Sequence, residues 1–153
     1  MTARFALAAL LLLGPAITSA QIDTATTSFD VNGLKVILRR NTANDVVAAN
    51  LYLLGGTQQL TPATQGIESF LLNASELGTK LFPKAAARRT LAQLGSTILV
   101  APREDWTVFG TTTIKSAFDS TWAVLSDRVM QPTLDSADVE LVRDRMLSRI
   151  RLA

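Results

Sequence analysis

The sequence predicts an α+β fold in which a layered antiparallel or mixed sheet is covered by helices on one face. Three observations predict it: Asn32 and Gly33 form a turn between two alternating segments, apolar strands follow, and other segments have a helical apolar period. The expected order of elements is β-β-β-α-α-β-β-α-α. A chain of 153 residues is long enough to bury a core of its own.

The strands are predicted from alternation and from apolar runs. Residues 29–31 and 34–38 alternate around the Asn-Gly pair, which is the strongest short signal for a hairpin. Residues 46–54 are almost entirely apolar and predict a central strand that is covered on both faces. Two further strands, joined as a hairpin by a short polar connector, are predicted at residues 97–101 and 106–114.

The helices are predicted where apolar residues recur every three or four positions. Their expected ranges are residues 67–77, 83–94, 118–129 and 136–150. Gly78, Gly95 and Pro132 end the first three helices, and Asp135 or Ser136 caps the fourth. The fourth helix has no stop signal before the chain ends, so we interpret the domain as incomplete at its C-terminus.

The N-terminus, residues 1–20, is predicted to be a secretory signal peptide. Arg4 supplies the positive charge, residues 5–13 form an apolar run, and small residues follow at the expected cleavage site. The protein is therefore expected to be exported, periplasmic or secreted, with no membrane span after cleavage; an uncleaved anchor is the alternative. Residues 21–28 are polar and predict a flexible lead before a domain at 29–153.

Neither histidine nor cysteine occurs in the chain. These side chains supply most zinc, copper and iron ligands and much of the acid–base catalysis at neutral pH. Their absence excludes a Ser-His-Asp triad, a cysteine nucleophile and a disulfide scaffold, and argues strongly against a self-contained zinc enzyme. The formal net charge of +2 is too small to indicate a nucleic-acid partner.

Four segments in order resemble the start of the pitrilysin/insulinase (inverzincin) family of metallopeptidases. They are FDVNGLKVIL from Phe29, the strand ending at Gly55 and Gly56, GIESFLLN from Gly66, and LGTK from Leu77. The family reads N-G-L-x-V, a strand ending near G-S, G-h-x-H-F-L-E-H and F-x-G-T-x at these places. The resemblance implies that residues 29–153 are part of the family's N-terminal domain, a metallopeptidase-like, ferredoxin-type arrangement.

The resemblance also implies a zinc site, which this sequence lacks. In H-x-x-E-H two histidines bind Zn²⁺, the glutamate activates water, and a distal glutamate completes the ligands. The histidine positions are Ser69 and Asn73, the general-base position is Leu72, and the distal ligand position is Arg149. Neutral oxygens bind zinc poorly, leucine cannot accept a proton, and arginine carries a permanent positive charge. We therefore expect no catalysis and no cofactor, although zinc is expected for the family.

A second departure concerns the substrate strand. Family members carry an Asn-Ala pair on an edge strand that receives the peptide as an added strand, and the aligned residues are Leu99 and Val100. Backbone pairing does not require asparagine, so this edge remains a candidate peptide-binding strand. The alternative interpretation is that both are ordinary strand residues in a core or a domain interface.

The resemblance implies a role as well as a fold. Inactive members of the family commonly pair with an active subunit and help to enclose a peptide chamber. We predict a non-catalytic subunit that assists peptide binding or proteolysis, with an active family member or the rest of a longer chain as partner. The alternatives are a stand-alone peptide-binding or scaffold module of the cell envelope and a non-functional truncated remnant.

Arginines also cluster in the chain, at residues 39–40, 88–89 and 143–151. Phosphates or anionic lipid headgroups are the ligands that such clusters can bind. Acidic residues are interleaved with several of them, so we interpret the clusters as solvated faces.

Overall fold

The computed structural model describes residues 25–83 and 85–152, which divide into two compact units between Thr42 and Ala43. This boundary falls after the first 14 residues of the predicted domain at 29–153. The predicted signal peptide at 1–20 lies outside the described residues. Each unit is described by itself.

The first unit is a hairpin of β1 (Thr26–Val31) and β2 (Leu34–Arg39), which pair antiparallel. Asn32 and Gly33 connect them with φ angles of 51° and 84°. Positive φ at both central residues is the geometry of a two-residue turn that matches the twist of paired strands. The predicted hairpin is confirmed. Because β1 begins at Thr26, the end of the predicted flexible lead at 21–28 belongs to a strand.

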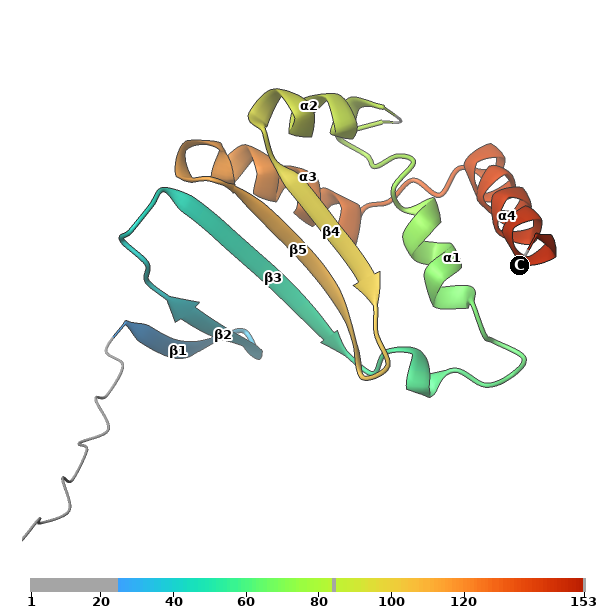
Figure 1. Cartoon of the computed structure of the whole chain (residues 1–153), viewed down its shortest axis with the longest axis horizontal. Helices are drawn as coiled ribbons and strands as arrows, with labels where there is room; N and C mark the ends of the chain where they lie inside the picture. Colours follow the sequence, from blue (N-terminus) through green and yellow to red (C-terminus); the bar gives the residue numbers. More distant parts are fainter. Residues whose placement is uncertain (1–24, 84, 153) are drawn as a thin grey trace, which may run out of the picture. The chain divides into compact units, whose positions relative to one another are not determined.

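The second unit contains an antiparallel sheet in the order β3-β5-β4 (Figure 1). Its strands are β3 (Val46–Leu54), β4 (Thr97–Pro102) and β5 (Trp106–Ile114). The α-helices are α1 (Ile67–Ala74), α2 (Ala86–Leu94), α3 (Phe118–Met130) and α4 (Ser136–Arg151). Two short 3₁₀ turns, η1 (Thr57–Gln59) and η2 (Lys115–Ala117), complete it. The predicted order of strands and helices is confirmed.

Helices α1 and α3 pack on one face of this sheet, as predicted, and α4 packs on α1. Leu51, Val100 and Phe109 come from three paired strands and share one face, because paired residues point to the same side. They pack with Leu72 of α1 and Leu125 of α3 in the apolar core. Figure 1 shows α1 between β4 and α4, in agreement with its contacts to both. The layered α+β class is therefore confirmed.

The prediction that residues 46–54 form the central strand is wrong. β3 lies at an edge of the three-stranded sheet, and β5 occupies the centre. Leu54 of β3 is 89% exposed, whereas Thr107, Thr111 and Thr113 of β5 are buried. The threonines tolerate burial because their hydroxyls are bonded; Thr111, for example, donates to the Thr97 carbonyl at 2.8 Å. Apolar composition therefore did not identify the central strand.

Two helix boundaries differ from the prediction. α1 ends at Ala74 rather than near Gly78, because the Ser75 hydroxyl donates to the Leu72 carbonyl at 2.9 Å and tight turns follow. α2 begins at Ala86, three residues after Pro83. The other ends agree more closely with prediction. Gly95 ends α2 in the left-handed region with φ 61°, and α3 and α4 cover their expected ranges. Asp135 occupies the N-cap of α4 without a side-chain capping bond.

A loop after β3 is tied to the β4–β5 turn by backbone hydrogen bonds. The amides of Gly55, Thr57 and Gln58 donate to carbonyls of residues 103–105 at 2.8–3.0 Å. Between them Gly56 adopts φ 52° and ψ −163°. A Cβ atom built on Gly56 would lie 2.4 Å from the carbonyl oxygens of Arg103 and Glu104. Only glycine fits this position.

We predict that Gly56→Ala lowers the free energy of unfolding by about 3 kcal/mol, because it combines a disfavoured backbone conformation with a backbone clash. Gly95→Ala is the matched control, since its φ is also positive but a Cβ atom meets nothing within 4 Å. The control is expected to cost about 1 kcal/mol. Chemical denaturation of both variants measures the difference, and equal losses would contradict the tied-loop interpretation.

Candidate functional site

Three of the four predicted lost-site positions lie on α1. Ser69, Leu72 and Asn73 occupy positions i, i+3 and i+4, which share one face of a helix. Leu72 is 8% exposed and belongs to the apolar core. Asn73 is exposed and donates its side-chain amide to the Ser69 carbonyl at 2.6 Å. The amide is therefore already used by the helix backbone.

The four predicted positions line two small cavities. Ser69, Leu72 and Asn73 line a cavity of about 100 Å³ that also touches Glu76, Val100, Pro102 and Arg128. Asn73 and Arg149 line a neighbouring cavity of about 70 Å³, again with Glu76. The distal position on α4 therefore lies beside the helix that carries the other three.

The predicted peptide-binding strand lies next to this site. β4 forms an edge of the three-stranded sheet in the described part of the chain, and it contacts α1. Val100 is half-buried on the helix-covered face and lines the same cavity as Ser69 and Leu72. Leu99 pairs with Gly110 on the opposite face and is 57% exposed. The structure therefore places only Val100 toward the site.

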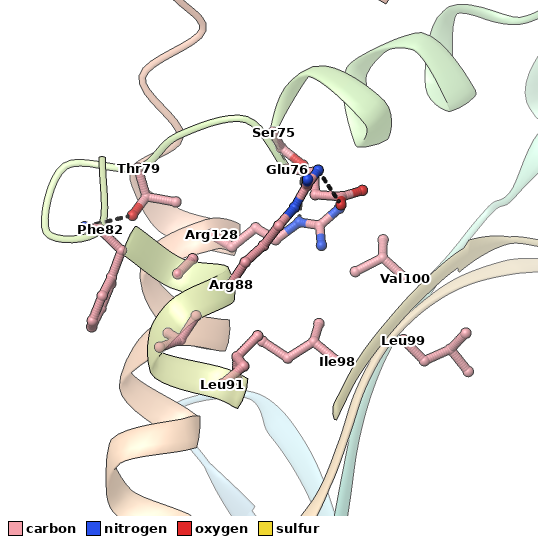
Figure 2. A pocket seen from close by; sticks show the side chains of 12 residues that line it. Ser75, Glu76, Thr79, Phe82, Arg88, Leu91, Ile98, Leu99, Val100 and Arg128 are labelled. Atoms are coloured by element: carbon pink, nitrogen blue, oxygen red, sulfur yellow. Dashed lines mark hydrogen bonds and ion pairs between the residues drawn. The ribbon is translucent and has the colours of Figure 1, made fainter. Parts of the chain in front are cut away.

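A larger cavity of about 260 Å³ continues along β4. Residues 98–100 of β4 form one wall, α2 contributes Arg88 and Leu91, and Glu76 and Arg128 lie at one end. Figure 2 shows Arg88 and Arg128 extending toward Glu76, with Ile98 and Val100 across from them. Arg88 and Glu76 form an ion pair at 3.1 Å. The cavity thus combines an apolar wall with a charged end.

Arg128 is one of two residues of this region that the sequence interpretation missed. From α3 it donates Nη2 to the Leu72 carbonyl at 3.0 Å and Nε to the Ser75 hydroxyl at 3.3 Å. These bonds hold the end of α1, where carbonyls lack helical partners. Burial lowers the pKa of Arg128, Glu76 opposes this shift, and Arg88 adds to it. Its partners lie 53 and 56 residues earlier, so no local pattern could reveal them.

Glu76 was also missed, although it follows the lost motif by less than one turn. Its carboxylate pairs with Arg88 and lines each of the cavities described above. The arginine clusters divide accordingly. Arg143 is exposed and pairs with Glu140 and Asp144, as the solvated-face interpretation predicts, but it also lines a cavity. Arg88, Arg145 and Arg149 line the cavities beside Glu76.

Two other kinds of site are not found among residues 25–83 and 85–152. In that part of the chain, no three side chains of the His, Cys, Asp or Glu types lie together as a metal site would require. None of the helices described there has both the length and the apolar composition needed to cross a bilayer.

A helix beside an edge strand, packed over an antiparallel sheet, defines an α+β domain. Residues 35–152 match the family model described as Insulinase (Peptidase family M16), and the chain belongs to that family. Comparison with curated protein sequences gives no significant match.

Solved structures share the fold at low sequence identity. The periplasmic protease PqqL from Escherichia coli is 18% identical, with a TM-score of 0.74 over 84% of this chain and 15% of PqqL. A separate structure of the first half of PqqL is also 18% identical. Its TM-score is 0.74, over 85% of this chain and 30% of that one. A protease from Helicobacter pylori is 16% identical. Its TM-score is 0.75, over 83% of this chain and 31% of that protease. The chain therefore spans less than a third of each of these structures.

We predict that Arg128→Met lowers the free energy of unfolding by about 2 kcal/mol, because the Leu72 carbonyl and Ser75 hydroxyl lose a charged donor. Arg89→Met is the control: Arg89 is an exposed arginine of α2 that lines none of these cavities. Its effect is expected to stay within about 0.5 kcal/mol. Denaturation midpoints measure both, and a similar small loss in each would contradict the anchoring role.

Proposed function

We propose that this protein is an exported, catalytically inactive member of the insulinase family that assists peptide binding or proteolysis by an active partner. One observation carries the proposal. Where the family's catalytic motif would lie, Ser69, Leu72 and Asn73 line a cavity with Arg128, and Arg149 lies in the adjoining cavity. Every family ligand and the general base is replaced.

The residues present do not fit a zinc ion. The Asn73 amide donates to a backbone carbonyl, and the Leu72 side chain is packed in the core. A half-buried guanidinium on one side and Arg149 on the other would repel a divalent cation. Without a bound cation or a carboxylate at position 72, nothing at these positions activates water.

Peptide binding is supported by the edge of β4. An extended peptide can add to such an edge through backbone hydrogen bonds while side-chain pockets give specificity. The cavities beside Val100 provide such pockets next to β4. Partnership with an active family member, or with the rest of a longer chain, is supported by the small share of PqqL that this chain spans. Export is supported by the predicted signal peptide and by the periplasmic location of PqqL.

Zinc titration with calorimetric detection tests the loss of the metal site. We expect no zinc binding by the protein and no zinc-dependent cleavage of an unstructured peptide. The triple variant Ser69→His/Asn73→His/Arg149→Glu is expected to gain zinc affinity, because it restores three ligands without placing a charge in the core at Leu72. Zinc-dependent cleavage by the unmodified protein alone would overturn the proposal of inactivity.

Assays with an active insulinase-family peptidase from the same cell test the partner role. We expect co-purification and a higher rate of peptide cleavage in the mixture than with the peptidase alone. Peptide binding without co-purification or stimulation would instead favour a stand-alone peptide-binding module. Binding of neither peptide nor peptidase would favour a non-functional remnant.

A further inference from the structure

Positive charge dominates the cavities that replace the metal site. Their lining contains four arginines and one acidic residue, which are Arg88, Arg128, Arg145, Arg149 and Glu76. A further cavity adds Asp138 beside Glu76 and Arg88, which leaves the whole region cationic. The family's position for a cation ligand has thus become a cationic surface in this chain.

Among the described residues, Arg128 forms hydrogen bonds but no ion pair. The Glu76 carboxylate pairs with Arg88, whereas both hydrogen bonds of Arg128 go to neutral oxygens. Within the described part of the chain, Nη1 of Arg128 meets no acceptor in hydrogen-bonding geometry. A half-buried guanidinium with an unused donor can bind an anion through a charge-assisted hydrogen bond.

The cavity next to Arg128 has the shape and lining for more than a simple ion. Its volume of about 260 Å³ is several times the ~30 Å³ that one water molecule occupies in the liquid. Leu91, Ile98, Val100 and Val124 supply apolar walls. Residues 98–100, which line this cavity, belong to the β4 edge to which the proposed peptide would add.

We propose that Arg128 binds a carboxylate carried by an extended peptide at the β4 edge, with an adjacent apolar side chain packed against Leu91 and Ile98. This inference rests on the proposed peptide binding and names the chemistry that the site recognises. A free C-terminal carboxylate and a glutamate side chain are the two sources of that group. Charge complementarity with the arginine-lined cavities selects the anionic peptide over neutral or basic ones.

Fluorescence anisotropy with the full chain tests the inference on three N-terminally labelled peptides of otherwise equal sequence. The first ends in leucine with a free carboxylate, the second in leucine amide, and the third in glutamate amide. We expect the leucine amide peptide to bind about tenfold or more weakly than the free acid, because it loses a charge-assisted bond. Strong binding of the third peptide assigns the site to an acidic side chain, and weak binding assigns it to the C-terminus.

A variant identifies the group responsible. Arg128→Met is expected to remove the preference for the free acid, while the control Arg89→Met retains it. Arg128→Lys retains a positive charge and replaces the methionine variant if that variant does not fold. It is expected to reduce the preference for the free acid, because lysine lacks the fixed fork of donors that arginine has. A preference that survives unchanged in the Arg128 variants would overturn the assignment.

The outcomes separate this inference from the proposed function. Equal affinity for all three peptides would overturn the carboxylate site and leave peptide binding intact. Binding of none of them would overturn the proposed peptide binding and the inference together.

Discussion

The packing of α1 onto the sheet is the contact on which the rest of the second unit depends. Leu72 packs in one cluster with Phe109 of β5 and Leu125 of α3, which joins α1, the sheet and α3 near the site. The carbonyl of the same residue accepts a bond from Arg128, so α1 is held through both its side chain and its backbone. The positions of Ser69 and Asn73 follow from that attachment.

The same attachment sets the packing at the positions where the family resemblance implies a metal site. In the family motif the position of Leu72 carries a glutamate that acts on water. A leucine there adds apolar contacts to the core, and burial of that side chain contributes about 2 kcal/mol by typical values. Arg128 supplies a positive charge close to the replaced ligand positions. The site is thus stabilised by packing and hydrogen bonds formed entirely by the protein.

The apolar surface that remains exposed reflects the same architecture. One face of the sheet packs on helices, while Tyr52, Leu54 and Trp106 on the other face stay largely accessible. The apolar sequence of β3 predicts a strand that is buried on both faces. The sequence does not show which elements lie against each face, so this prediction could not be checked before the structure was known. The prediction that β3 is the central strand was therefore wrong, whereas the hairpin of β1 and β2, which was predicted from its turn residues, was confirmed.

The sequence by itself determined the approximate secondary structure and the order of the elements, because these depend on local periods and turns. The prediction that catalytic residues are missing rests on motif spacing. Tertiary structure decided the rest. It placed β5 at the centre, brought Arg149 beside Asn73, and joined Arg128 to the end of α1. These contacts link residues far apart along the chain, and their energies depend on burial and geometry that no local pattern encodes.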